Sequence, residues 1–369
     1  MVAKLFEPIA IGGLSLSNRI VIAPMCQYSA EDGQMTDWHL MHLGQLAISG
    51  AGVLTIEAAA VLPEGRITYA DVGLYDDATE AAIARVLSAV RQWSDIPVAI
   101  QLAHAGRKAS TTRPWDGGGQ IAANSPNGWR TVAPSALPFL DADEAPVALD
   151  IDGLDRIRTA FADAAVRAAR LGIDAVQLHA AHGYLLHQFL SPLSNRRNDQ
   201  YGGSLENRMR FPLEVFDIVQ GAFGKQGPVT VRVSGTDWVD GGWSIEETAI
   251  FAQALEARGC SAINVSSGGL HPAQKIALAP GYQVPLSRQV KDAVTIPVIA
   301  VGLITEPAQA EAIIAGGDAD AVAIARAVLY DPRWPWHAAA ALGATIAVPP
   351  QYERSEPREH RGLYTLRPA

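Results

Sequence analysis

The chain has 369 residues, of which 49% are hydrophobic and 18% are charged, a composition typical of a soluble globular protein with a sizeable core. Its net charge of −9, without a basic stripe, argues against nucleic-acid binding, and no long apolar run indicates a membrane span. Residues 1–8 show no secretory h-region, so we expect a cytoplasmic protein. Two cysteines, Cys26 and Cys260, are too few to hold an iron–sulfur cluster.

Short apolar runs recur along the chain, and each is followed by a segment with helical features. Continuous apolar runs of this length indicate parallel strands that are buried on both faces. The runs cover residues 19–23, 53–58, 97–102, 175–179, 229–233, 262–266, 297–301 and 321–324. Among the segments between them, Asp77 with Glu80 and Ser244 with Glu247 have the spacing of a capping box at a helix start.

This βα alternation predicts an α/β protein with a (β/α)8 TIM-barrel fold, in which residues 1–369 form a single domain. A doubly wound sheet is the structural alternative, but no G-x-G-x-x-G fingerprint follows any of the predicted strands. The irregular region 105–150, after the third strand, is expected to be a lid or substrate loop, with a passive insertion as the alternative. Residues from about 345 to 369 form a C-terminal tail without periodicity.

In this fold the active site lies at the C-terminal ends of the strands. Arg232 alternates with the apolar residues of the fifth strand, so it is expected to point inward, where a buried guanidinium needs an anion. Gly302 and Arg326 follow the seventh and eighth strands, where barrels often bind phosphate. Together they predict a phosphate-bearing cofactor across the barrel mouth, with an ordinary salt bridge as the alternative for Arg326.

His179 and His182 follow the fourth strand and allow three interpretations. A metal site is disfavoured because the spacing is i, i+3 and no neighbouring carboxylate completes a ligand set, so we expect no metal. The pair is better suited to donating hydrogen bonds to one oxygen, with ordinary core histidines as the alternative. Cys26, after the first strand, is either a nucleophile or a residue that tunes a cofactor, whereas Cys260 is expected to be a packing residue.

Several of these segments together resemble the Old Yellow Enzyme family. The most specific is residues 179–208, HAAHGYLLHQFLSPLSNRRNDQYGGSLENR, supported by Asn18-Arg19, Pro24-Met25 and residues 101–107, QLAHAGR. The resemblance covers roughly residues 3–355. At positions 26 and 28, Cys26 and Tyr28 resemble the residues of the thermophilic-like subclass, which includes xenobiotic reductases and NADPH dehydrogenases of bacilli.

The resemblance implies tightly bound, non-covalent FMN in a (β/α)8 barrel. The residues expected to line its ring system are Ala23, Pro24, Met25, Cys26 and Ala60. Gln101 would bind the pyrimidine edge, Arg232 would lie near N1 and O2, and Cys26 would tune the redox potential. Gly302, Ala325 and Arg326 would hold the phosphate. Ala325 departs from the glycine usual in the family, and its methyl group restricts the backbone.

The implied reaction is ene reduction: NADPH or NADH reduces FMN, which transfers hydride to Cβ of an enone, enal, maleimide or nitro compound. His179 and His182 would bind the carbonyl or nitro oxygen, Tyr184 would protonate Cα, and Tyr28 would line the substrate pocket. Arg354 would reach from the C-terminal tail across a dimer interface into the neighbouring site, so a homodimer or dimer-based oligomer is expected; a solvated tail is the alternative. Loop 113–145 is individual to this sequence, which leaves substrate scope open.

Two functional alternatives differ from an ene-reductase. A barrel lyase or isomerase with a phosphate-bearing substrate and no flavin would also use a histidine pair and Arg326. A non-catalytic FMN-binding protein would keep the flavin but would not be reduced by NADPH.

Overall fold

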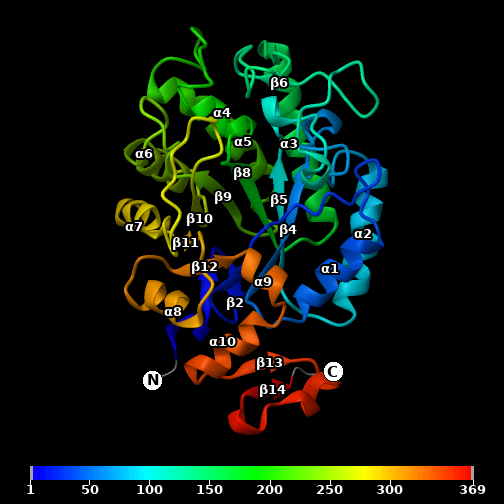
Figure 1. Cartoon of the computed structure of the whole chain (residues 1–369), viewed down its shortest axis with the longest axis vertical. Helices are drawn as coiled ribbons and strands as arrows, with labels where there is room; N and C mark the ends of the chain where they lie inside the picture. The colour runs from blue at the N-terminus through cyan, green and yellow to red at the C-terminus, as the bar shows by residue number, and fades with distance from the viewer. Residues whose placement is uncertain (1–2, 367–369) are drawn as a thin grey trace.

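The computed structural model describes residues 3–366, and its central feature is a closed barrel of eight parallel strands (Figure 1). Each strand pairs with its neighbours in chain order, and the last strand, β12, pairs with the first, β3. The barrel strands are β3 (Ile20–Ile22), β4 (Val53–Ala60), β5 (Val98–Ala103), β8 (Ala175–Ala180), β9 (Val229–Ser234), β10 (Ile263–Ser266), β11 (Val298–Ala300) and β12 (Ala321–Ile324). All eight strands expected from the apolar runs are confirmed.

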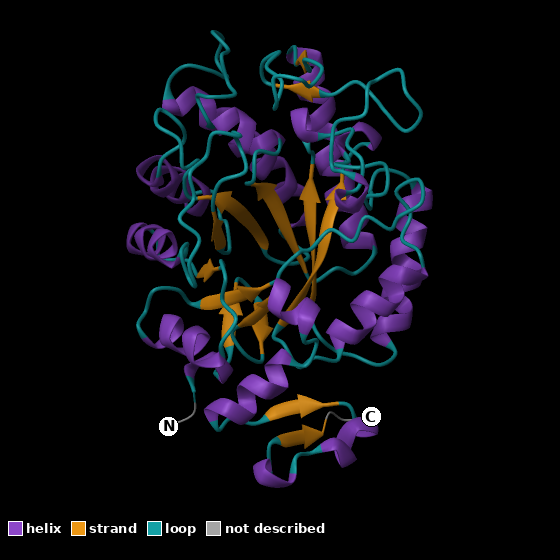
Figure 2. Cartoon of the chain, in the orientation of Figure 1, coloured by secondary structure: helices purple, strands orange, loops and turns teal. Residues whose placement is uncertain are grey.

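Helices surround the barrel on its outside, as Figure 2 shows by colour. They are α1 (Asp37–Ala47), α2 (Asp77–Arg91), α3 (Ile151–Arg170), α4 (Leu185–Leu190), α5 (Leu205–Phe223), α6 (Ile245–Glu256), α7 (Val284–Ala293), α8 (Pro307–Ala315), α9 (Arg326–Tyr330) and α10 (Trp334–Leu342). The capping box of Ser244 and Glu247 is confirmed at α6. The expected capping box at α2 is wrong by one residue, because Asp76 is the N-cap and accepts from the Thr79 backbone N–H at 2.8 Å. Asp77 and Glu80 form ion pairs with Arg167 instead.

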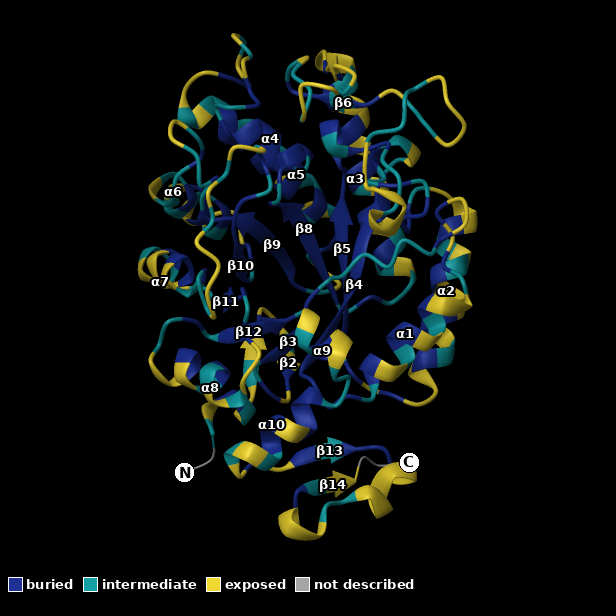
Figure 3. Cartoon of the chain, in the orientation of Figure 1, coloured by how far each residue is buried: buried dark blue, intermediate teal, exposed yellow. Residues whose placement is uncertain are grey.

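The interior of the barrel holds mostly small side chains, which suits the limited space inside eight strands. Alternate residues of the strands, among them Val21, Ala99, Ala175 and Ala321, form this inner core. The hairpin of β1 (Ile9–Ile11) and β2 (Leu14–Leu16) packs into the same core and closes the N-terminal end of the barrel. A larger core lies between strands and helices, so the strands are buried on both faces (Figure 3). Because the hairpin closes the N-terminal end, the barrel interior can receive a ligand from its C-terminal end.

Two regions lie outside the regular βα units. Residues 105–150 contain little beyond the 3-10 helices η3 (Gly106–Lys108) and η4 (Pro114–Asp116) and the pair β6 (Val132–Ala133) and β7 (Val147–Ala148). The C-terminal extension consists of β13 (Ile346–Val348), η5 (Pro350–Ser355), η6 (Arg358–His360) and β14 (Tyr364–Leu366), and it packs on α10 at the bottom of Figure 1. Two further 3-10 helices are η1 (Lys4–Phe6) and η2 (Pro63–Gly65).

Within residues 3–366, no helix is both long and apolar enough to cross a bilayer.

Candidate active site

Three polar side chains lie next to one another at the C-terminal end of the barrel interior. The register of the sheet pairs His179 of β8 with Arg232 of β9, and Arg232 with Asn264 of β10. Because Ala175 belongs to the inner core and side chains alternate along a strand, His179 also faces the barrel interior. All three residues are buried. The barrel therefore places a cation, an imidazole and an amide side by side at its mouth.

The Arg232 guanidinium is a buried cation without a compensating carboxylate among residues 3–366, and its Nε has no hydrogen-bond partner there. Burial lowers the pKa of Arg232 to about 10, which still leaves it charged at neutral pH. Both polar atoms of the neighbouring Asn264 amide also lack partners within the described chain. Leaving such groups unsatisfied is costly. The arrangement therefore fits a polar, electron-rich ligand at the barrel mouth, as a flavin would be.

The two histidines and Tyr184 form a cluster at the end of β8. The His179 Nε2 and His182 Nδ1 atoms are 3.3 Å apart, and the Tyr184 ring lies edge-on to His179 with a centroid distance of 4.8 Å. Burial, and next the charge of Arg232, lower the pKa of both histidines well below the usual value, so both rings are neutral at pH 7. The Ala181 backbone N–H donates to His179 Nδ1, so the proton of this neutral ring lies on Nε2. Burial raises the pKa of Tyr184, which keeps its hydroxyl protonated.

The segment after β3 contributes Ala23, Pro24, Met25, Cys26 and Tyr28 to the same end of the barrel. Burial raises the pKa of the Cys26 thiol, and the carboxylates of Asp71 and Glu57 raise it further, so Cys26 is a thiol and not a thiolate. A thiol is a poor nucleophile, which favours the tuning role over the nucleophile. Burial also raises the pKa of Tyr28.

Ala60 and Gln101 lie on β4 and β5, on the opposite side of the mouth from β10. Both are buried, and the Gln101 side-chain amide donates to Gln177 Oε1 at 2.7 Å. The alanines at 58 and 60 follow a register shift in β4, and their small side chains leave space beside Gln101. A flat ring system can be accommodated against such a surface.

The residues expected at the phosphate end follow β11 and β12. Gly302 has φ +117°, and a Cβ there would lie 2.5 Å from Gln283 Nε2, so this position requires glycine. Ala325 precedes α9 with φ −112° and ψ −92°, so it does not adopt the left-handed conformation that would favour the glycine usual in the family. Arg326 is exposed, and no hydrogen bond or ion pair joins its side chain to another residue within 3–366. The salt bridge that is the alternative interpretation of Arg326 is therefore not observed among residues 3–366, and neither is a contact between Arg326 and the rest of the site.

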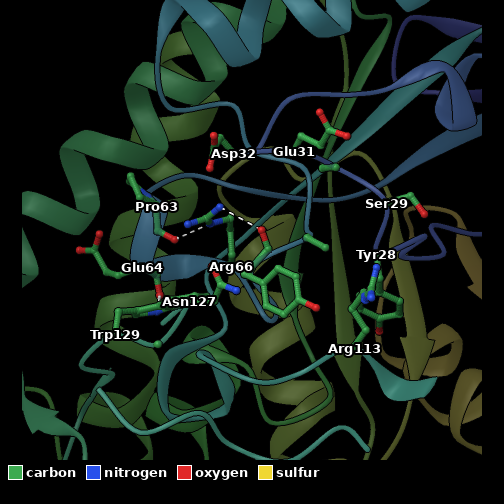
Figure 4. Close-up of a pocket in the computed structure, with 14 residues that line it drawn as sticks. Tyr28, Ser29, Glu31, Asp32, Pro63, Glu64, Arg66, Arg113, Asn127 and Trp129 are labelled. Atoms are coloured by element: carbon green, nitrogen blue, oxygen red, sulfur yellow. Dashed lines mark hydrogen bonds between the residues drawn. The ribbon is translucent and has the colours of Figure 1, made fainter. Parts of the chain in front are cut away.

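Beyond Tyr28 the site borders a cavity of about 880 Å³, lined by residues from β3–α1, β4–α2 and the 105–150 region (Figure 4). Arg66 stacks on Trp129 at 5.2 Å and donates to the carbonyl oxygens of Pro63 and Tyr69. Tyr28 also meets Trp115 edge-on at 5.9 Å. Tyr28 thus lies between the buried cluster and an open cavity, which is the place expected of a residue that lines a substrate entrance.

A comparison with known families agrees with this geometry: residues 4–344 match the model of the NADH:flavin oxidoreductase / NADH oxidase family. The chain belongs to this family. The match covers most of the chain, so the protein is an oxidoreductase enzyme of a flavin-using family.

Individual relatives of the chain carry related names. It is 44% identical over 331 residues to NADH:flavin oxidoreductase FG08077 of Gibberella zeae, covering 85% of this chain and 80% of the relative. It is 40% identical over 356 residues to an NADPH dehydrogenase of a Geobacillus species, covering 96% and 99%. The solved structure of morphinone reductase superposes with a TM-score of 0.77 at 30% identity, covering 99% and 94%. The resemblance to Old Yellow Enzymes and bacillar NADPH dehydrogenases is confirmed.

Lys108 is a residue of the oxidoreductase's site to which the sequence assigns no role. Its Nζ donates to the backbone oxygens of His182 at 2.9 Å and Gly269 at 2.8 Å, and it lies 5.3 Å from the Tyr184 ring centroid. Lys108 therefore joins the loops after β8 and β10 above the histidine pair. The contacts span 74 and 161 residues, so no local pattern indicates them, and only the position of Lys108 after the third strand points to the site.

We expect substrate binding to depend on the charge of Lys108. Burial, and next the charge of Arg107, lower the pKa of Lys108 to about 8, so the amine is charged at pH 7 and neutral at pH 9. Loss of the charge weakens its hydrogen bonds to the carbonyls by roughly 1 kcal/mol, so the Michaelis constant for an enone should rise about fivefold between these pH values. Steady-state kinetics of wild type and Lys108→Met tests this, since the variant should lack the rise. An equal rise in both would contradict it.

Arg354 is expected to lie outside the barrel mouth of its own chain, because it would enter the site of a second copy. It is exposed on η5 in the C-terminal extension, outside the barrel mouth of its own chain.

Among residues 3–366, no group of three or more histidine, cysteine, aspartate and glutamate side chains is arranged to hold a metal ion.

Proposed function

We propose that the protein is an ene-reductase that binds FMN, oxidises NADPH or NADH, and reduces the activated C=C bond of an enone, enal, maleimide or nitro compound. The observation that carries the proposal is the buried Arg232 guanidinium, which lacks a carboxylate partner and lies directly beside His179. The electron-rich edge of a flavin ring would accept hydrogen bonds from that cation. The histidine cluster beside it could donate hydrogen bonds to an oxygen of the substrate.

The residues that would hold FMN are those around the mouth. Ala23, Pro24, Met25, Cys26 and Ala60 would line the ring system, with Gln101 and Arg232 at its polar edge, and Gly302, Ala325 and Arg326 would hold the phosphate. When bound, FMN would accept a hydride from the nicotinamide and deliver one to Cβ of the substrate. Two opposite charges about 4 Å apart attract by roughly 4 kcal/mol at an effective dielectric near 20, so Arg232 would favour the anionic form of the cofactor.

The histidine cluster would act on the substrate. Hydride arrival at Cβ moves negative charge onto the carbonyl oxygen, and preorganised donors aimed at that oxygen stabilise the transition state. His179 can donate from Nε2, because its Nδ1 accepts from Ala181. His182 would be the second donor from its Nδ1, with its Nε2 accepting from the Ser266 hydroxyl, whose Oγ lies 2.7 Å away. Tyr184, protonated by virtue of its burial, would deliver a proton to Cα.

The proposal is tested by mixing the purified protein anaerobically with NADPH and then with cyclohexenone, while visible absorbance is followed. Bleaching of the flavin by NADPH and its return with cyclohexenone would support an ene-reductase. A colourless protein that releases no flavin on denaturation would favour a lyase or isomerase. Bound flavin that NADPH does not reduce would favour a non-catalytic FMN-binding protein.

Cys26 should tune the redox potential of the bound flavin. Cys26→Ser replaces a polarisable thiol by a smaller hydroxyl that is a stronger hydrogen-bond donor. We therefore expect the midpoint potential to change while flavin content stays the same, as measured by dye-coupled reduction with xanthine oxidase. Cys260→Ser is the matched control, since Cys260 is buried before β10. Equal potentials for Cys26→Ser and wild type would remove the tuning role.

Arg354 is proposed to enter the site of a second copy of the chain. Its extension packs on the outside of α10 and leaves the Arg354 side chain exposed, as a residue that serves a partner would be. Arg354→Ala should raise the Michaelis constants of enones about tenfold, typical of one lost charge-assisted contact, without changing flavin content. Arg361→Ala, another exposed arginine of the same extension, is the control. Unchanged Michaelis constants across several enones would refute the proposal.

A further inference from the structure

Two residues of the proposed site adopt left-handed backbone conformations that side chains rarely take. Tyr28 has φ +50° and His182 has φ +59°, and His182 is followed by Gly183 at +75°. Such conformations persist only where the surroundings fix them, and they gather at functional sites. The groups that fix these two segments therefore affect how the site is shaped.

The backbone on both sides of Tyr28 is held by α1 and β4. Glu57 lies at the register shift of β4, and its Oε2 accepts the Gln27 N–H at 2.9 Å. Thr36, the N-cap of α1, donates from Oγ1 to the Ser29 carbonyl oxygen at 2.9 Å. His39 joins these two anchors, because its Nδ1 accepts the Thr36 N–H at 3.0 Å and its Nε2 lies 3.3 Å from Glu57 Oε1.

The segment from His182 to Tyr184 is held in a similar way from behind α4. His187 Nδ1 accepts the Gly183 N–H at 2.9 Å, and His187 Nε2 lies 2.9 Å from Asp237 Oδ1. Asp237 Oδ2 in turn accepts from Ser191 Oγ at the end of α4 and from the Trp243 N–H. The side chains of His187 and Asp237 are completely buried.

The two arrangements are alike. Each places a buried histidine at ion-pair distance from a buried carboxylate. Each also binds the backbone N–H of a residue adjacent to a left-handed one, Gln27 before Tyr28 and Gly183 after His182. His39 Nε2 lies 3.3 Å from Glu57 Oε1, and His187 Nε2 lies 2.9 Å from Asp237 Oδ1, within ion-pair distance. In both histidines Nδ1 accepts a backbone N–H, which leaves the ring proton on Nε2, the ring nitrogen nearer to the carboxylate. None of these four side chains is needed to contact a substrate.

We propose that His39–Glu57 and His187–Asp237 are positioning pairs, the first for Tyr28 and Cys26 and the second for the segment that carries His182 and Tyr184. The consequence for catalysis rests on the proposed function, but the positioning itself concerns the protein alone. Glu57 has a second effect, since its charge raises the pKa of the Cys26 thiol one residue before Gln27.

The first pair is tested by alkylation with iodoacetamide at pH 7.5, with Cys26 and Cys260 quantified separately by mass spectrometry. Glu57→Gln keeps the size of the side chain but removes its charge, so Cys26 becomes more thiolate-like and less firmly placed. Its labelling rate should rise by more than about twofold, because the thiolate is the reactive form. The rate should also rise in His39→Gln, which keeps the Glu57 charge and loses only the contact that joins Thr36 to Glu57. Buried Cys260 should stay unlabelled. The same rate as wild type, or a parallel rise at Cys260 that reports general loosening, would overturn the assignment.

A variant of the second pair is the control for the labelling experiment on the first pair, and a variant of the first pair is the control for phenol binding. Asp237→Asn should leave Cys26 labelling unchanged but weaken binding of a phenol to the flavin-loaded protein by on the order of tenfold, because a small displacement of binding groups costs that much or more. The matched control is Asp174→Asn, at the other end of the barrel, where the carboxylate also accepts a backbone N–H, from Val98 at 2.8 Å. If the two asparagine variants bind phenol as wild type does, His187–Asp237 is not a positioning pair.

Two further provisions separate the possible failures. If Asp237→Asn or Glu57→Gln does not fold, His187→Gln or His39→Gln removes the other member of the same pair and is measured in its place. If wild type contains no flavin and binds none, the proposed function has failed. The Cys26 labelling experiment needs no flavin and then still decides whether His39–Glu57 positions the Tyr28 segment.

Discussion

Tyr184→Phe should slow the reduction of cyclohexenone by about 10²–10⁴-fold, the usual contribution of a positioned general acid, while NADPH oxidation in the first turnover stays nearly unchanged. Tyr184 follows β8 directly and lies against His179, and burial raises the pKa of its hydroxyl. A hydroxyl that remains protonated can supply a proton to Cα, whereas the nicotinamide half of the cycle requires no proton from the protein. The effect should therefore be confined to one half-reaction.

Rapid mixing of NADPH with the oxidised protein, and of cyclohexenone with the reduced protein, separates the two half-reactions. Tyr201→Phe is a suitable control, because it removes another buried tyrosine hydroxyl, which binds Glu214 and Arg158 away from the mouth. If Tyr184→Phe slowed both half-reactions equally, Tyr184 would be a general support of the site and not the selective proton donor.

Much of the fold could be predicted because parallel strands that are buried on both faces leave a plain signal. Runs such as residues 229–233 and 321–324 are continuous and apolar, and all eight became barrel strands. The exception within such a run, Arg232, was informative for the same reason, since a charged residue on a barrel strand must face a partner or a ligand. Its burial beside His179 agrees with that expectation.

The parts that could not be predicted depend on contacts between distant loops and on backbone conformation. Lys108 became part of the site only through two carbonyl oxygens on other loops, and no local pattern encodes such contacts. The N-cap of α2 is Asp76, and not Asp77 as expected. The two side chains have the same chemistry, so only the backbone geometry distinguishes them. Arg326 is exposed and has no hydrogen-bond or ion-pair partner among residues 3–366, so its role at a phosphate stays a prediction.

The second large effect is expected for His179→Ala, which should lower the rate of enone reduction by on the order of 10²–10³-fold, as the loss of one preorganised donor usually does. His179 is buried and neutral, because burial and the charge of Arg232 lower its pKa, and its Nε2–H lies next to His182. A neutral donor does not titrate between pH 6 and 8, so the loss should be similar across this range.

Phenols report on the same donors without turnover, since a bound phenolate stacked on oxidised flavin gives a long-wavelength charge-transfer band. In His179→Ala this band should disappear, and the Michaelis constant for cyclohexenone should rise, while flavin content stays at the wild-type level. His337→Ala on α10 is the control, because that side chain is 71% exposed and lies far along the chain from β8. A variant that kept both the band and the wild-type Michaelis constant would show that the substrate oxygen is bound by other groups, and Lys108, held above the histidine pair, would be the first to test.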